Sequence, residues 1–145
     1  MTLPSEPRQR LAVVTCMDAR IDVYRMLDLQ LGDAHVIRNA GGRVTEDVIR
    51  SLALSQAFLG TNEIKVVHHT GCAMRVPSDA ELAEGVRRAA DALPPFAMLA
   101  IADEQEAIRA DVAALRESPF LAHRDQVRGL LYDLETGQLT EVTAQ

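Results

Sequence analysis

The sequence has 145 residues, of which 48% are hydrophobic and 25% are charged, and its formal net charge is −6. These values are typical of one globular domain, and they exclude a disordered chain and a basic nucleic-acid-binding protein. No apolar run reaches the roughly 18 residues that a membrane helix needs, so we expect a cytoplasmic protein without a membrane partner. The polar segment 1–10 is unlike a secretory signal, and it is expected to form a short N-terminal arm before a single domain, residues 11–145.

The first half of the chain predicts strands and a well-delimited helix. Residues 11–15, 34–37 and 64–69 are short apolar runs rich in valine and isoleucine, which is typical of buried strands. Thr45 is placed to cap a helix that Gly60 ends. The apolar face of this helix is predicted to hold Val48, Ile49, Leu52, Ser55, Phe58 and Leu59. The order of strand, crossover and strand predicts an α/β fold, with a mostly parallel central sheet flanked by helices.

The second half predicts two more helices and a hairpin. Ser78–Leu93 is expected to be helical, with the start capped by its first two residues and the end followed by two prolines. Residues 96–102 fit a strand or a loop by composition. Residues 103–117 have a helical pattern, and 128–134 and 139–142 are predicted to pair across a turn.

Cysteine and histidine side chains occur where predicted strands end. Cys16 follows the first strand, with Asp18 and Arg20 close behind it, and the third strand ends at His69, three residues before Cys72. Because the carboxyl ends of parallel strands open at one edge of a sheet, we expect these residues to lie close together. Two thiolates and one imidazole suit zinc, and three protein ligands are the number found in catalytic sites. The sequence therefore predicts one zinc ion per chain.

The chemistry expected of such a site is that of a zinc-bound hydroxide. Zinc lowers the pKa of a bound water and makes a nucleophile available near neutral pH. Two thiolates offset the charge of the cation, so we expect activity to rise towards alkaline pH. Asp18 and Arg20 are close enough to pair, and the held carboxylate can then orient the zinc-bound water. Without Arg20, the same carboxylate could occupy the open zinc position.

Other interpretations of these residues remain open at this point. The two cysteines could be buried structural thiols or a redox pair, and Asp18 could be a permanent fourth ligand in a non-catalytic, zinc-stabilised protein. His68 neighbours His69 on the strand, so its side chain points to the opposite face and is interpreted as packed or hydrogen-bonded. Asn39, Gly41 and Gly42 are candidates for a pocket wall or for a tight turn.

Together the two motifs resemble a known family. Cys16-Met-Asp18-Ala-Arg20, followed by His69-Thr-Gly-Cys72, is similar to the signature of the beta-class carbonic anhydrases, in particular to their short actinobacterial-type members. The resemblance implies a lyase that reversibly hydrates carbon dioxide to bicarbonate and a proton, with zinc on the two cysteines and the histidine and with the Asp18–Arg20 dyad. It also implies four parallel strands plus an antiparallel edge strand, and a homodimer or dimer of dimers.

The chain also departs from the family in ways that affect these expectations. Its arm is short, so the dimer contact could be reduced, and it lacks the tryptophan of the noncatalytic bicarbonate pocket that some members carry. Residues 96–102 correspond to a variable loop of the family, and we therefore interpret them as a loop. Relatives with the same ligand motif hydrolyse carbonyl sulfide or carbon disulfide, which is the alternative function for this zinc site.

Overall fold

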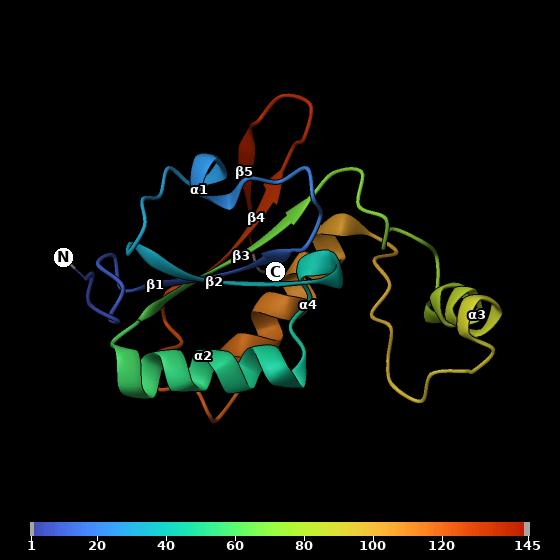
Figure 1. Cartoon of the computed structure of the whole chain (residues 1–145), viewed down its shortest axis with the longest axis horizontal. Helices are drawn as coiled ribbons and strands as arrows, with labels where there is room; N and C mark the ends of the chain where they lie inside the picture. Colours follow the sequence, from blue (N-terminus) through green and yellow to red (C-terminus); the bar gives the residue numbers. More distant parts are fainter. Residues whose placement is uncertain (1, 144–145) are drawn as a thin grey trace.

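The computed structural model describes residues 2–143, and it is built on one five-stranded sheet (Figure 1). The strand order is β2-β1-β3-β4-β5, with the first four strands parallel and β5 antiparallel to β4, which confirms the predicted fold class. The strands are β1 (Leu11–Cys16), β2 (Ala34–Asn39), β3 (Glu63–His69), β4 (Val127–Tyr132) and β5 (Leu139–Val142). Residue 1 of the predicted arm and residues 144–145 of the predicted domain lie outside the described residues.

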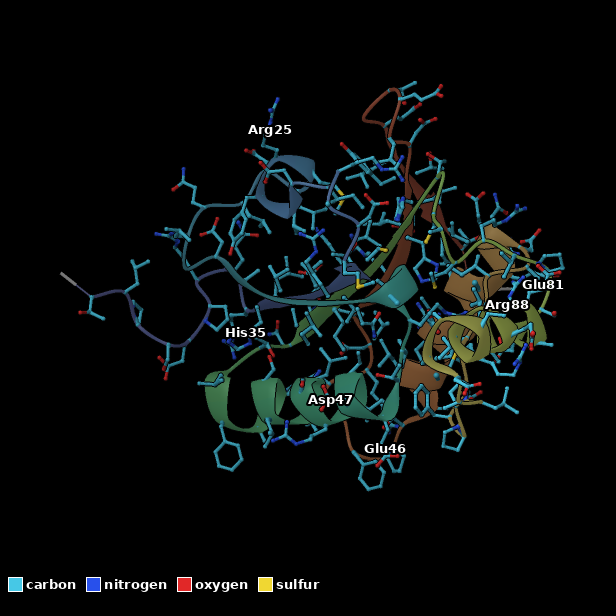
Figure 2. The ribbon with its side chains drawn as sticks, turned by 45° about the vertical axis from the view of Figure 1, so that its right-hand side comes forward. Arg25, His35, Glu46, Asp47, Glu81 and Arg88 are labelled. Carbon is cyan, nitrogen blue, oxygen red and sulfur yellow. The ribbon has the colours of Figure 1, made fainter. Side chains whose placement is uncertain are left out.

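Helices pack on both faces of this sheet. The helical elements are α1 (Val23–Met26), the short 3-10 turn η1 (Ala40–Gly42), α2 (Glu46–Leu59), α3 (Asp79–Ala90) and α4 (Glu104–Glu117). Of the longer helices, α2 and α4 cover the sheet with apolar side chains (Figure 2). Apolar residues of α2 and α4 share one core cluster with Ala12 and Val14 of β1, and those of α1 share another with Leu11 and Val13. Helix α3 lies apart from the sheet and has no buried residue (Figure 1). Within residues 2–143, every helix is too short or too polar to span a bilayer.

The caps of α2 are the predicted residues, whereas Phe58 of its predicted apolar face is exposed. Thr45 Oγ1 accepts the N–H of Val48 at 3.3 Å, and Gly60 ends the helix in a left-handed conformation with φ 76°. Val48 and Leu52 are buried against the sheet. Phe58 was predicted to widen this face, but it is 75% exposed, because its position lies to the side of the buried stripe and turns towards solvent.

Several element bounds differ from the sequence prediction. β4 ends at Tyr132, before the predicted residue 134, because the chain turns at Asp133 towards β5. β2 continues two residues past Ile37, because its pairing with β1 extends to the Cys16–Asn39 register. Helix α3 ends at Ala90, before the predicted Leu93, because Asp91 adopts a left-handed conformation that stops the helix. The four-residue α1 had no counterpart in the prediction. Residues 96–102 lack regular secondary structure, as expected.

Gly129 of β4 is required by the packing of α4 on the sheet. A Cβ atom at this position would lie 2.3 Å from Cγ2 of Ile108 and 3.1 Å from Cγ2 of Val112. We expect Gly129→Ala to lower the free energy of unfolding by about 1 to 3 kcal/mol, because an overpacked core must shift or strain.

Urea denaturation at one fixed protein concentration measures this effect. Gly85→Ala on α3 is the matched control, because nothing lies within 4 Å of its added Cβ and alanine favours a helix more than glycine does. An unfolding midpoint of Gly129→Ala equal to that of the unmodified chain would show that the contact relaxes without cost.

Candidate metal centre

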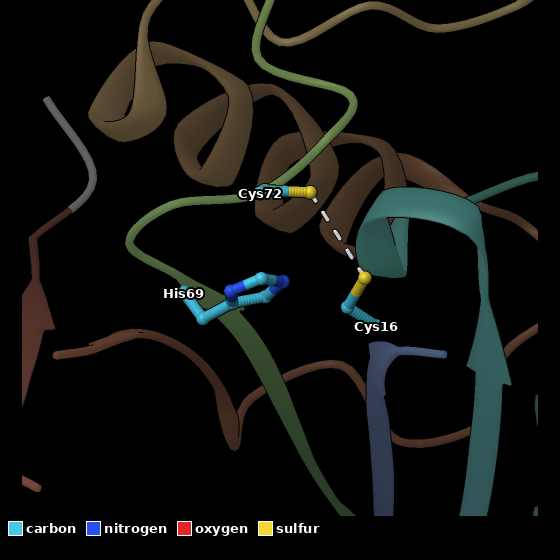
Figure 3. A group of neighbouring side chains, drawn as sticks. All are labelled: Cys16, His69 and Cys72. Atoms are coloured by element: carbon cyan, nitrogen blue, oxygen red, sulfur yellow. Dashed lines mark hydrogen bonds between the residues drawn. The ribbon is translucent and has the colours of Figure 1, made fainter. Parts of the chain in front are cut away.

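Three side chains that could hold a metal ion meet at the carboxyl edge of the sheet (Figure 3). Cys16 ends β1, His69 ends β3, and Cys72 follows in the loop after β3. One donor atom of each lies within 4.8 Å of the other two, and the two Sγ atoms are 4.0 Å apart. All three residues are buried. Side chains that are far apart in the sequence are thus brought together, as predicted, because β1 and β3 are parallel neighbours.

The hydrogen bonding of His69 leaves the right nitrogen free for a metal. Its Nδ1 lies 2.7 Å from the carbonyl oxygen of Thr70, and because a carbonyl only accepts, Nδ1 carries the proton. Nε2 then has a lone pair, yet it is buried without a hydrogen-bond partner among the described residues. This free imidazole nitrogen and the two nearby thiols together form a donor set typical of zinc sites, so these residues fit a zinc ion.

The thiol of Cys72 lies in surroundings that disfavour its ionised form. Removal from solvent raises the pKa of this thiol to about 11, and the neighbouring Cys16 sulfur adds to the increase. A coordinating metal deprotonates such thiols, because its charge stabilises the thiolate where water cannot.

Gly42 and backbone hydrogen bonds fix the position of Cys16. Gly42 has φ 65°, and a Cβ atom there would lie 2.8 Å from both the nitrogen of Cys16 and the carbonyl carbon of Thr15. Only glycine accommodates this conformation and this approach without strain. The N–H of Met17 donates to the carbonyl of Asn39 at 2.8 Å. The turn that contains Asn39 and Gly42 thus packs against Cys16 and helps to hold it in place.

Asp18 and Arg20 form a bidentate ion pair at the mouth of this site. Arg20 donates from Nη2 to Asp18 Oδ2 at 2.7 Å and from Nε to Oδ1 at 3.0 Å. These hydrogen bonds hold the pKa of the Asp18 carboxyl well below its usual range. Arg20 Nη2 also donates to the carbonyl of Gly71 at 2.9 Å, which joins the loop after β1 to the loop that carries Cys72. Asp18 Oδ2 lies 3.8 Å from the orphaned Nε2 of His69, so the carboxylate faces the three donor atoms.

Arg38 is a site residue to which the sequence assigned no particular role. Its guanidinium donates to the carbonyl of Cys16 at 2.8 Å and to that of Asp18 at 2.7 Å. It therefore holds the loop that carries both a donor and the dyad carboxylate. The signal that could identify it is the register, because Arg38 pairs with Thr15 one residue before Cys16, and register is set by packing.

Comparison with known proteins places this arrangement in a family. The carbonic anhydrase family model matches residues 11–86. The chain is 44% identical over 141 residues to beta-carbonic anhydrase 1 of Mycobacterium tuberculosis, covering 97% of this chain and 86% of the relative. It is 34% identical over 155 residues to a carbon disulfide hydrolase of an Acidianus species, covering 90% and 76% respectively.

Solved structures agree with these relationships. The carbonic anhydrase of Streptococcus mutans superposes with a TM-score of 0.93 at 44% identity, covering 99% of this chain and 87% of that one. The apo form of a carbon disulfide hydrolase gives a TM-score of 0.81 at 32% identity, covering 96% and 81%. The match to the family model, the near-complete coverage of a beta-class relative and the shared fold lead to one conclusion: the chain belongs to the beta-class carbonic anhydrase family.

Proposed function

We propose that this chain is a carbonic anhydrase that reversibly hydrates carbon dioxide to bicarbonate and a proton, using one zinc ion held by Cys16, His69 and Cys72. The observation that supports this most strongly is the buried Nε2 of His69, which has no hydrogen-bond partner in residues 2–143 and lies beside two thiols 4.0 Å apart. Zinc in such a site supplies a water of lowered pKa, and thus a hydroxide nucleophile, near neutral pH.

In this mechanism Asp18 orients the attacking water. Because Arg20 keeps the carboxylate ionised, Asp18 accepts a hydrogen bond and cannot donate one. By accepting a hydrogen bond from the O–H of the attacking oxygen, Asp18 would direct an oxygen lone pair away from the carboxylate, towards the carbon of carbon dioxide. Arg20 anchors the carboxylate by three hydrogen bonds, two from its guanidinium and one from its backbone N–H at 2.8 Å, which would also keep Asp18 from turning to bind the metal as a permanent ligand.

A stopped-flow assay of carbon dioxide hydration across pH, with zinc measured on the same preparation, tests this proposal. We expect one zinc per chain and turnover that rises towards alkaline pH, because two thiolates offset the charge of the cation. Hydrolysis of carbonyl sulfide and carbon disulfide is assayed in parallel, because a relative at 34% identity is a carbon disulfide hydrolase. Sulfide release without carbon dioxide hydration would contradict the proposal, and so would a zinc-loaded chain with neither activity.

We further propose that the chain acts as a homodimer, alone or as a dimer of dimers, through the open edge of β2. Among the described residues β2 pairs only with β1, and an unpaired edge favours association with another strand. A groove of about 350 Å³ follows this edge between β2 and α2, and Leu54 on its rim is 41% exposed.

Leu54→Glu is expected to weaken the dimer at least about tenfold, because the association would bury an unpaired charge. Sedimentation velocity over a range of protein concentrations measures the dissociation constant. Leu31→Glu is the control, because this leucine is 72% exposed and lies before the amino end of β2. A monomeric unmodified chain, or an unchanged dimer in Leu54→Glu, would contradict the proposed interface.

We also propose where the protein is located in the cell and how its chain is organised into domains. Both cysteines are free thiols, which suits a reducing compartment, and we place the protein in the cytoplasm. We propose that residues 11–145 work as one zinc domain preceded by the short arm, residues 1–10.

A further inference from the structure

A buried ionic cluster lies on the opposite side of β3 from the three donor atoms. Asp111 of α4 is 4% exposed, and its Oδ2 accepts from Arg43 Nε at 2.8 Å and faces His68 Nε2 at 3.0 Å. Its Oδ1 accepts from Arg43 Nη2 at 3.3 Å. Because a carboxylate accepts, His68 donates from Nε2, and its orientation is fixed by Asp111. None of these three residues has a part in the mechanism above.

Arg43 extends this cluster to a loop in an unusual conformation. Its Nη1 donates to the carbonyl of Leu99 at 3.0 Å and to that of Ala100 at 3.2 Å. Leu99 has φ 59°, a left-handed conformation that a leucine adopts only when its surroundings hold it. Asp79 holds the same segment from the other side, by accepting the N–H groups of Leu99 and Ala100 at 3.2 and 2.7 Å. The side chain of Asn39 brackets the backbone of Arg43 with two hydrogen bonds.

The cluster reaches the candidate metal centre from two directions. His68 is the strand neighbour of His69, so fixing His68 also fixes the backbone that presents His69. Arg43 follows Gly42, whose backbone lies against Cys16. One carboxylate, that of Asp111, therefore connects the segments that carry two of the three donor atoms.

We propose that Asp111 is a positioning residue for the metal centre, holding the Cys16 and His69 segments in register through Arg43 and His68. This inference rests on the proposed function, since it requires a metal on these residues. A buried ion pair contributes little net stability compared with apolar packing, but its hydrogen bonds define one geometry. Both carboxylate oxygens of Asp111 are bonded here, while Nδ1 of His68 is buried without a partner among the described residues, so Asp111 alone orients this ring by a side-chain hydrogen bond. Removing the charge of Asp111 leaves the Arg43 guanidinium buried without a counterion, so Arg43 must move, and the Gly42–Cys16 contact moves with it.

Asp111→Asn, loaded with zinc and separately with cobalt, tests this role. We expect a chelator to remove zinc about tenfold faster than from the unmodified chain, a change typical of residues that orient metal ligands. We also expect a shift in the visible cobalt–thiolate absorption, and a fall in kcat larger than the change in KM. Asp33→Asn is the matched control, because Asp33 is equally buried and pairs with Arg8, but it precedes the amino end of β2.

Arg43→Lys provides a second variant if Asp111→Asn does not fold. Lysine keeps the positive charge but lacks the forked guanidinium group that reaches Asp111 and both loop carbonyls. We therefore expect the same faster release of zinc. Zinc release and a cobalt spectrum that match the unmodified chain in either variant would overturn the inference, even where stability falls as in Asp33→Asn. An unmodified chain that takes up no metal would overturn the proposed function as well, so the two failures are distinguishable.

Discussion

Replacing Cys72 with serine is expected to abolish stoichiometric zinc binding and to reduce carbon dioxide hydration to background. Zinc binding by thiolate and imidazole sites corresponds to about 10 to 16 kcal/mol, so one of three ligands accounts for roughly 3 to 5 kcal/mol. This share corresponds to a loss of affinity of about a hundredfold to several thousandfold. The serine hydroxyl is almost as large as the thiol, but it does not ionise near neutral pH and offers no soft sulfur.

Metal analysis after dialysis, together with a competition titration against a chelator of known affinity, measures this loss. Ala73→Ser is the control, because it introduces the same hydroxyl at the exposed position next to the proposed ligand. We expect that variant to keep its zinc. If Cys72→Ser retained one zinc per chain, the assigned ligand set would be wrong.

Replacing Asp18 with asparagine is expected to leave zinc binding intact while lowering kcat by about 10² to 10⁴, the range typical of a positioned acid–base group. The side chains have the same shape, so the loop stays in place. The amide, however, loses the negative charge that Arg20 holds at 2.7 Å, and one of its two polar atoms becomes a donor. A carboxylate that accepted from both Arg20 and the attacking water is replaced by a group that cannot accept at both positions.

Stopped-flow kinetics on metal-analysed protein separates this effect from metal loss. Asp22→Asn is the matched control, because Asp22 lies in the same loop but caps α1, where its carboxylate accepts the N–H of Arg25 at 3.2 Å. Asparagine caps helices as well as aspartate does, so this control should keep full turnover. Undiminished turnover in Asp18→Asn would rule out the proposed role of the dyad.

Much of the fold follows from local chemistry in the sequence. The valine-rich runs that form β1 and β3 are buried on both faces, which is the signature of a parallel strand and needs no tertiary information. Thr45 begins α2 and Gly60 ends it, both through interactions with residues close in the sequence, so these caps could be predicted from the sequence. By contrast, α1 is a single turn and too short for a helical period, and the exposure of Phe58 depends on which side of α2 packs against the sheet.

The residues of the candidate site likewise differ in whether the sequence alone could identify them. Cys16, His69 and Cys72 could be brought together from the sequence, because two of them end parallel strands and the third follows a tight turn. Arg38 and Asp111 could not be, because their partners lie 22 and 68 residues away and are chosen by strand register and helix packing. A charged residue in a sequence gives no sign of which distant carbonyl or guanidinium it will meet.

Zinc K-edge X-ray absorption of the purified, metal-loaded chain tests the ligand assignment most directly. We predict two sulfur atoms at about 2.3 Å and a remaining shell of nitrogen or oxygen at about 2.0 to 2.1 Å. A zinc shell without sulfur, or with one sulfur only, would contradict the assignment of Cys16 and Cys72 as joint ligands with His69.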